Sequence, residues 1–193
     1  YTINIYSRTG MRLLKKLFSF EIQKDKELFK KIYDLNWKNI INVNNTFSIK
    51  TKLKSTLFDN SNYTTLIIKD AIVDQMRKTY NKRPSIDKIN PDIGLFVFIN
   101  INKVTIYINT SGEPLFKRGY RNIIHKASLN EALSAGLVLL SNWDAKKNFY
   151  DIMCGSGTIP IEAAMIAFKI PPGILRKNYA FQKFNNYNKT LFK

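Results

Sequence analysis

The chain has 193 residues, of which 45% are hydrophobic and 13% aromatic, so it can form a packed core and is not disordered as a whole. Its 31 Lys and Arg residues against 14 Asp and Glu residues give a formal net charge of +17, which favours a polyanionic partner. One Cys and one His exclude a disulfide scaffold and a Cys- or His-based metal cluster.

The positive charge is spread along the whole chain. The residues before Gly112 include 19 basic and 9 acidic side chains, and those from Gly112 onward include 12 and 5. Lys, Asn and Ile are abundant together, as in AT-rich coding sequence, so part of the charge can reflect base composition. Such a bias would raise Glu as well. Because acidic residues stay few, an anionic partner explains the balance better.

The first half of the chain alternates helix and strand patterns. We expect residues 11–18 to form a half-buried strand with exposed lysines rather than a targeting peptide. Residues 24–35 place apolar side chains at helical spacing, 46–53 alternate with period two as in a strand, and 63–80 repeat apolar side chains at i+4 as in a long helix. Residues 94–110 then predict a strand, a tight turn and a second strand.

A polar and basic connection over residues 111–121 separates these elements from the second half, and we place a domain boundary there. Ser128 and Glu131 are spaced as in a capping box, which predicts the start of a helix. The buried stripe of that helix is expected to consist of Leu129, Leu133, Leu137 and Leu140.

An apolar strand is expected over residues 148–153, followed at once by a Cys-Gly-Ser-Gly-Thr loop and a helix over 159–168. Strand, acidic residue, glycine loop and helix are the layout of a mononucleotide-binding crossover in a doubly wound fold. The lysine of a Walker loop is missing after Gly157, and Pro160 stands where a dinucleotide fingerprint has its third glycine.

What remains at this loop is similar to the first motif of S-adenosylmethionine-dependent methyltransferases, with a plain strand-to-helix turn as the alternative. The glycines would let a ligand approach the backbone, and the helix N-terminus would offer unpaired amides. The residues predicted to bind this cofactor are Asp151, Met153, Cys154, Gly155, Ser156, Gly157 and Thr158.

Longer strings resemble a known family. SGEPLFKRGYR at 111–121 and DIMCGSGTIPIEAA at 151–164, with KDAIVD at 69–74 and RPSID at 83–87, look like the THUMP-domain RNA guanine-N2 methyltransferases, above all those that act on bacterial 23S ribosomal RNA. The resemblance implies an α/β fold class, with an α+β THUMP domain followed by the start of a Rossmann-like methyltransferase domain. The segments it implies are 1–20, the end of a ferredoxin-like domain; 21–112, the RNA-binding THUMP domain; 113–127, a basic linker; and 128–193, the N-terminal part of the methyltransferase domain.

The resemblance also implies an activity, namely methylation of guanine N2 in ribosomal RNA with S-adenosyl-L-methionine as cofactor and RNA, 23S rRNA first, as partner. The family's catalytic N/D-P-P-Y motif does not occur in these residues, and no acidic residue follows Glu162 to hold the cofactor ribose. No catalytic residue is therefore assigned, and this stretch is expected to be inactive alone. The alternatives are a non-catalytic THUMP-type RNA-binding module and, less well matched, half of a nucleotide-binding oxidoreductase.

Two basic groups are candidate RNA contacts. The residues predicted to bind RNA are Lys117, Arg118 and Arg121 on the connection, and Lys69, Arg77, Lys78 and Arg83 near the long helix. The carboxylates of Asp70 and Asp74 are expected to form ordinary salt bridges on a helix face. His125 is expected to be a polar loop residue.

Three further expectations come from features that are missing. We expect no metal, because the sequence has one Cys and one His, and no membrane partner, because no apolar stretch reaches about 18 residues. A single reduced Cys without a secretory signal favours a cytoplasmic location.

Overall fold

The computed structural model describes residues 1–121 and 128–192, and the prediction for His125 lies outside them. The chain divides into two compact units. Unit 1 consists of Tyr1–Leu13 and Ser111–Tyr179, and unit 2 of Leu14–Thr110 and Ala180–Lys193. Each unit is therefore built from two separate stretches of chain, whereas the sequence suggested four consecutive segments.

Unit 2 contains a five-stranded mixed sheet, so the chain has the expected α/β fold class. The strands, in the order β1-β5-β4-β2-β3, are β1 (Leu14–Glu21), β5 (Lys103–Asn109), β4 (Ile93–Asn100), β2 (Thr46–Lys54) and β3 (Ser85–Ile86). β5 is antiparallel to both β1 and β4, and β2 is parallel to both β4 and β3. Strands β4 and β5 form the hairpin expected from the sequence, and the lysine-rich segment near the N-terminus forms β1 instead of a targeting peptide.

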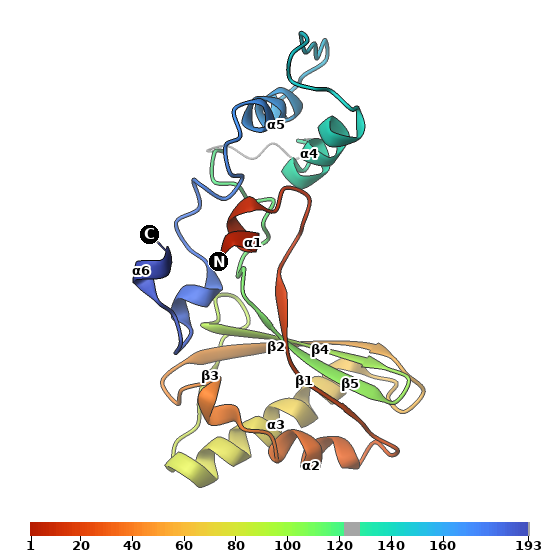
Figure 1. Ribbon diagram of the computed structural model, residues 1–193. Helices are drawn as coiled ribbons and strands as arrows, with labels where there is room; N and C mark the ends of the chain where they lie inside the picture. Colours follow the sequence, from red (N-terminus) through yellow and green to blue (C-terminus); the bar gives the residue numbers. More distant parts are fainter. Residues whose placement is uncertain (122–127, 193) are drawn as a thin grey trace. The chain divides into compact units, whose positions relative to one another are not determined.

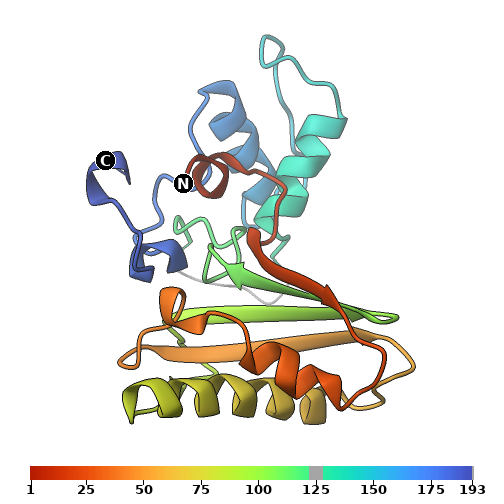
Figure 2. The ribbon, with the colours of Figure 1, turned by 60° about the horizontal axis from the view of Figure 1, so that its bottom comes forward.

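Helices cover one face of this sheet (Figures 1 and 2). These are α2 (Glu27–Tyr33), the short 3-10 helix η1 (Trp37–Asn39) and the twenty-residue α3 (Ser61–Tyr80). Asn60 caps α3 by accepting from the amides of Asn62 and Tyr63, at 2.9 and 3.0 Å, which explains why the helix begins there. The two helices expected from apolar periodicity are thus confirmed.

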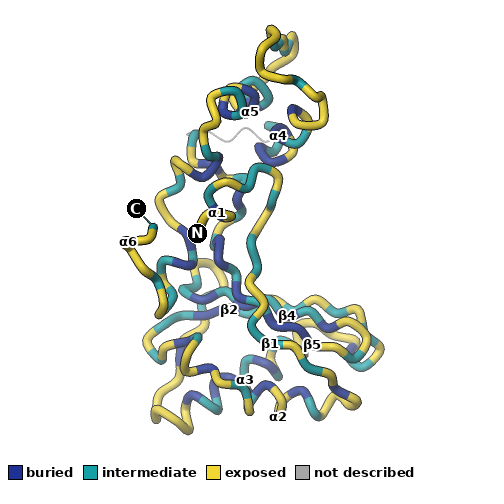
Figure 3. Tube along the Cα trace, in the orientation of Figure 1, coloured by how far each residue is buried: buried dark blue, intermediate teal, exposed yellow. Residues whose placement is uncertain are grey.

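The core of unit 2 lies between these helices and the sheet. Alternate residues of β4 and β5 are buried, together with the apolar face of α3 and the ring of Trp37. The dark segments of Figure 3 trace this layer along the sheet and α3. Two further short elements of unit 2 follow later in the chain, η2 (Ala180–Lys183) and α6 (Lys189–Phe192).

Unit 1 has three helices among its described residues, α1 (Thr2–Tyr6), α4 (Glu131–Leu140) and α5 (Thr158–Ala167). Helices α4 and α5 pack against each other. Their buried apolar side chains are Ala132, Ala135, Val138, Ala163 and Met165. No described helix of the chain is long and apolar enough to cross a membrane.

The expected leucine stripe of α4 is wrong. Leu133, Leu137 and Leu140 are all exposed, the last by 80%. The sequence shows two apolar faces on this helix, one of leucines and one of small residues, and the small residues Ala132, Ala135 and Val138 are the buried ones. Small side chains allow two helices to approach closely, and α4 and α5 pack against each other.

The predicted capping box is also wrong. Asn130, not Ser128, is the N-cap of α4, and its Oδ1 accepts from the amide of Leu133 at 3.1 Å. The Ser128 hydroxyl is buried, and it has no hydrogen-bond partner among the residues that the structure describes. Glu131 points to Arg121 instead of back to the cap. The Glu131 carboxylate therefore pairs with the Arg121 guanidinium and not with the backbone amide of the N-cap residue, which a capping box requires.

Residues 148–153, expected to be a strand, have no regular secondary structure. A strand exists only through ladder hydrogen bonds with a neighbour, and unit 1 has no strand among its described residues. The apolar side chains of the segment are consequently exposed, Ile152 by 95% and Met153 by 88%. The exposed loop between α4 and α5 is visible in Figure 3.

Candidate functional site

The glycine loop turns tightly into α5. The Gly157 amide donates to the Cys154 carbonyl at 2.8 Å, and the Ile161 amide donates to the Gly157 carbonyl at 3.0 Å. Gly155 and Gly157 have φ of 53° and 72°, in the left-handed region that other residues rarely adopt. A Cβ at Gly155 would meet no atom within 4 Å. The backbone of the loop is therefore open to an approaching ligand.

The first turn of α5 has no side-chain cap. Gly157 is its N-cap and provides no side-chain acceptor, so the amides that begin the helix keep their capacity to donate. Such an end carries partial positive charge and suits an anionic group. Helix start and open glycine backbone together form a surface that can receive a carboxylate.

Asp151 lies at the entrance of the loop with one half of its carboxylate unused. Oδ1 accepts from the Met153 amide at 3.3 Å. Oδ2 is buried and has no hydrogen-bond partner among the described residues. A buried acceptor without a donor is costly, so this oxygen can be satisfied by a ligand that brings a donor, such as an ammonium group.

Arg121 fixes the start of α5. Its Nη2 donates to the Leu129 carbonyl at 2.9 Å and to the Thr158 hydroxyl, and its Nη1 lies 3.4 Å from the Glu131 carboxylate. The Thr158 side chain, which is buried, lies 3.1 Å from the Ser156 hydroxyl. The sequence predicted that Arg121 contacts RNA. The structure uses its guanidinium to join the starts of α4 and α5.

Arg118 forms the buried centre of unit 1. Its Nε lies 3.3 Å from Glu162 Oε1, and its Nη1 and Nη2 donate to the carbonyls of Leu115, Ser7 and Arg8. Arg118 is 1% exposed and Glu162 0%. The prediction that Arg118 binds RNA is wrong, because a buried guanidinium with every edge engaged has no surface for a phosphate.

Two neighbouring groups have shifted pKa values because they lie in or beside this buried region. Tyr120 donates to Glu162 Oε1 at 3.1 Å, and burial, together with the Glu162 charge, raises the pKa of the Tyr120 phenol. Burial lowers the pKa of Arg8, whose guanidinium donates to the carbonyls of Met165 and Ile170. Both groups serve to hold chain segments together.

Arg176 is a structural residue that sequence reasoning missed. Its guanidinium donates to the carbonyls of Pro114, Lys117, Ser111 and Glu113, at 2.6 to 3.3 Å, and lies 4.9 Å from the centroid of the Tyr179 ring. No local pattern marks it. The one available signal is that the turn-rich 111–121 segment has many carbonyls that need donors.

The remaining predicted RNA contacts lie on the surface. Lys117 pairs with Glu113, whose pKa is lowered by this hydrogen bond. Lys78 and Arg83 are exposed. Lys69 pairs with Asp70 at 2.7 Å and Arg77 with Asp74 at 3.5 Å, which confirms the expected salt bridges of these two carboxylates.

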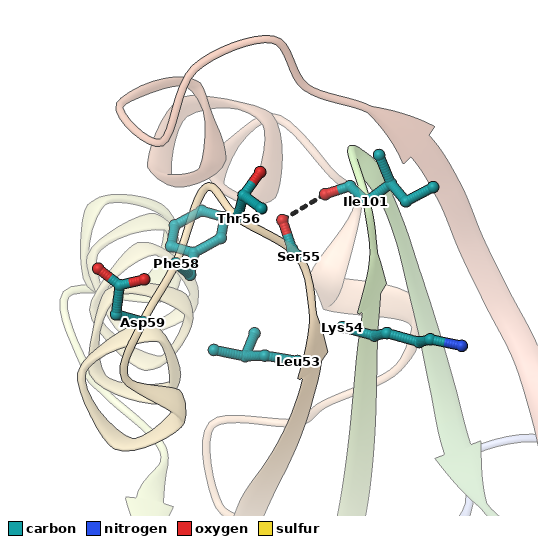
Figure 4. Close-up of a pocket in the computed structure, with 7 residues that line it drawn as sticks. All are labelled: Leu53, Lys54, Ser55, Thr56, Phe58, Asp59 and Ile101. Carbon is teal, nitrogen blue, oxygen red and sulfur yellow. Dashed lines mark hydrogen bonds between the residues drawn. The ribbon is translucent and has the colours of Figure 1, made fainter.

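Other kinds of site find little support. The part of the chain that the structure describes contains no group of three His, Cys, Asp or Glu residues able to hold a metal ion. Unit 2 has a hollow of about 550 Å³ at the ends of β2 and of the β4–β5 turn, where the Ser55 hydroxyl donates to the Ile101 carbonyl (Figure 4). Ile101 has a φ of 55° because it lies in the tight turn between β4 and β5, which needs a left-handed residue.

Comparison with known proteins finds two domains along the chain. A family model of the THUMP domain matches residues 23–109, and one described as "RMKL-like, methyltransferase domain" matches residues 118–191. The ribosomal RNA large subunit methyltransferase K/L of Buchnera aphidicola subsp. Acyrthosiphon pisum is 38% identical over 194 residues, which is 100% of this chain and 28% of that protein. The chain thus spans less than a third of the length of this curated relative.

Two solved structures are similar over half of their own length. A protein of Listeria monocytogenes, described as a predicted N6-adenine-specific DNA methylase, has a TM-score of 0.86 and 33% identity, and the match covers 98% of this chain and 50% of that one. A putative methyltransferase complexed with SAH has a TM-score of 0.82 and 30% identity, covering 97% of this chain and 50% of that one.

Proposed function

We propose that this chain, which carries a THUMP domain and an RMKL-like methyltransferase domain, is part of an S-adenosylmethionine-dependent enzyme that methylates guanine N2 in ribosomal RNA. RNA, and 23S ribosomal RNA first, is the proposed substrate because the curated relative is named for the large ribosomal subunit. DNA, the substrate named for the Listeria protein, is less well supported. This chain carries a THUMP domain, which in the family that it resembles is the RNA-binding domain. A cytoplasmic location belongs to the proposal.

The observation that carries this proposal is the unused Oδ2 of Asp151 beside the uncapped start of α5. S-adenosylmethionine, when bound, supplies a methyl group on a sulfonium, and its amino-acid part carries one ammonium and one carboxylate. Asp151 would accept from that ammonium, and the α5 amides would donate to that carboxylate. The putative methyltransferase complexed with SAH supports this fit.

Other side chains of unit 1 keep this loop in shape. Arg121 holds the Thr158 hydroxyl, and Thr158 in turn lies within hydrogen-bond distance of Ser156. Gly155 and Gly157 adopt the left-handed backbone and carry no Cβ, so no side chain at these two positions blocks a ligand. The loop is therefore preorganised, which lowers the cost of binding.

The chemistry at the base needs residues that these 193 do not provide. An exocyclic amine becomes a better nucleophile when acceptors bind its protons, and orientation toward the methyl group supplies much of the rate. The N/D-P-P-Y motif that would offer those acceptors is not in this sequence. The second candidate, a non-catalytic RNA-binding module, rests on the match of residues 23–109 to the THUMP domain.

Reading the polypeptide that follows Lys193 separates these two candidates. The methyltransferase proposal expects an N/D-P-P-Y string within the same domain. Its absence from the full-length sequence would refute the catalytic function and leave the RNA-binding module.

The cofactor site is tested by calorimetry with S-adenosylhomocysteine on the full-length protein. Asp151→Asn should weaken binding at least roughly tenfold, because the charged acceptor for the ammonium is lost. Asp144→Asn is the matched control, since Asp144 lies in the same exposed loop and bonds only the Lys146 amide among the described contacts. Equal affinity of the Asp151→Asn variant and the wild type would contradict the assignment.

A further inference from the structure

The sheet of unit 2 has a second face, away from α2 and α3. Successive side chains of a strand point to opposite faces, and Ile93, Leu95, Val97 and Ile99 of β4 point to the helices and the core. Phe96 and Phe98 therefore lie on the second face. In Figure 4, Lys54 leaves β2 on the side opposite Leu53 and Phe58.

The strand register arranges this second face in rows that run across four strands. The first row is Lys50, Phe96, Tyr107 and Lys16; the second is Lys52, Phe98, Thr105 and Ser19; the third is Lys54, Asn100, Lys103 and Glu21. Neighbouring strands are about 4.8 Å apart, and rows are separated by roughly 7 Å. Aromatic rings thus occupy the central strands, with lysines at the margins.

Apart from Thr105, which is buried, the side chains of these rows are exposed or half-buried. Lys50, Lys52, Lys54 and Lys16 are exposed, and the three rings are half-buried. None of the three rings is among the residues packed against the core cluster. The Phe96 and Tyr107 rings lie 6.3 Å apart, tilted by 48°, so they form a short continuous aromatic surface.

The charge of the face is strongly one-sided. Glu21 is the one acidic residue among the strand positions of these rows, and it is paired in register with Lys103. Half-buried rings with exposed lysines beside them match single-stranded nucleic acid, because bases stack on rings while ammonium groups meet phosphates.

We propose that this aromatic–lysine face, made of Phe96, Phe98, Tyr107, Lys50, Lys52 and Lys16, binds single-stranded RNA. The bases stack on the three rings, and the phosphates lie along the lysines of β2 and β1. The inference rests on the proposed RNA substrate and assigns it a surface that differs from the α3 group suggested by the sequence. It predicts a preference for unpaired RNA, since bases within a duplex cannot reach the rings.

The test is fluorescence anisotropy of the full-length protein with a labelled single-stranded uridine oligonucleotide and a labelled RNA duplex. Phe96→Leu with Phe98→Leu should weaken single-strand binding at least roughly tenfold while duplex binding stays within about twofold. Leucine retains apolar volume but removes the rings. Circular dichroism checks that the sheet still forms.

A charge-only variant keeps the proposal testable if the aromatic variant fails to fold. Lys50→Gln with Lys52→Gln alters exposed side chains only, and should weaken single-strand binding and reduce its log-log salt slope by about 1.4, because each phosphate contact on a single strand contributes about 0.7. The matched control is Lys24→Gln with Lys26→Gln, two exposed lysines just before α2. Equal losses in the two lysine variants would overturn the proposal, because they would show only a diffuse charge effect.

The outcomes also separate this inference from the proposed function. If the wild type binds single-stranded RNA and the variants of the face bind equally well, the face is wrong and the RNA substrate stands. If the wild type binds no RNA while S-adenosylhomocysteine still binds, the RNA substrate and the face both fail. A change in oligomeric state of the aromatic variant without loss of RNA affinity would identify a protein contact and overturn the proposal.

Discussion

Different interactions stabilise the interior of each unit. Unit 2 has a continuous apolar core between a sheet and helices, and its strands satisfy one another's backbone. Unit 1 has short helices and long irregular segments, and arginines satisfy the carbonyls of those segments. The comparison shows that a basic residue can either stabilise the interior of a unit or remain exposed on its surface. In unit 1 Arg118 and Arg176 are structural, whereas the lysines on the sheet of unit 2 are exposed.

The largest expected effect comes from breaking the buried ion pair of unit 1. Arg118→Met leaves the Glu162 carboxylate buried without its partner and removes donors from three carbonyls. We expect a loss of about 3–5 kcal/mol in the stability of unit 1. Hydrogen exchange of α5 peptides measures this loss directly.

Lys117→Ala is the control for that variant, because Lys117 forms an exposed pair with Glu113. Such pairs contribute about 0–1 kcal/mol. If Arg118→Met and Lys117→Ala changed the exchange of α5 by the same amount, the distinction between buried and exposed basic residues would not hold.

The second effect tests unit 2. Ile72 is fully buried in α3, and Ile72→Ala should cost about 2–5 kcal/mol through lost contacts and the cavity left behind. Denaturant unfolding followed by hydrogen exchange in β4 and β5 measures it. Leu66→Ala, at a half-exposed position of the same helix, should cost much less, and a reversed order would contradict the assigned core.

Sequence patterns predicted unit 2 much better than unit 1. The i+4 repeat of Ile68, Ile72 and Met76 and the alternation of β2 reflect burial on one face, and unit 2 contains the partners that bury them. Residues 148–153 also have a strand pattern, but pairing decides whether a strand forms, and unit 1 offers no partner strand among its described residues. Strand propensity depends on the local sequence, whereas strand pairing depends on a second strand elsewhere in the chain.

The candidate site was predictable in part, and for a similar reason. The glycine loop was visible because its backbone requirement is local to Gly155 and Gly157. The roles of Arg118 and Arg121 were not visible, because their acceptors lie up to 111 residues away in the chain. A charged residue in a polar segment gives no sign of whether it will meet a phosphate or a distant carbonyl.

A smaller effect distinguishes the two proposed caps of α4. Asn130→Ala should destabilise unit 1 by about 1 kcal/mol, because the Asn130 side chain caps the Leu133 amide. Ser128→Ala should be neutral or slightly stabilising, since its buried hydroxyl bonds to none of the described residues. Thermal unfolding measures both, and the opposite order would restore the capping box read from the sequence.

The smallest expected effect is a pH dependence in unit 2. The hydrogen bonds from Lys183, at 2.8 Å, and from Thr46 lower the pKa of Asp92 below its ordinary value of 3.8. A carboxylate with a lowered folded-state pKa adds stability above pH 4 that is lost as pH falls through the folded value. Asp92→Asn should therefore flatten the acid side of the stability curve, and an unchanged slope would contradict this contribution.

The central claim is that this chain belongs to an enzyme whose cofactor loop begins at Asp151. The most direct test is transfer of a labelled methyl group from S-adenosylmethionine to ribosomal RNA by the full-length protein, followed by nucleoside analysis. We predict label on guanine N2 with the wild type, at least tenfold less with Asp151→Asn, and no change with Asp144→Asn. Label on another base, or equal transfer by Asp151→Asn and the wild type, would contradict the claim.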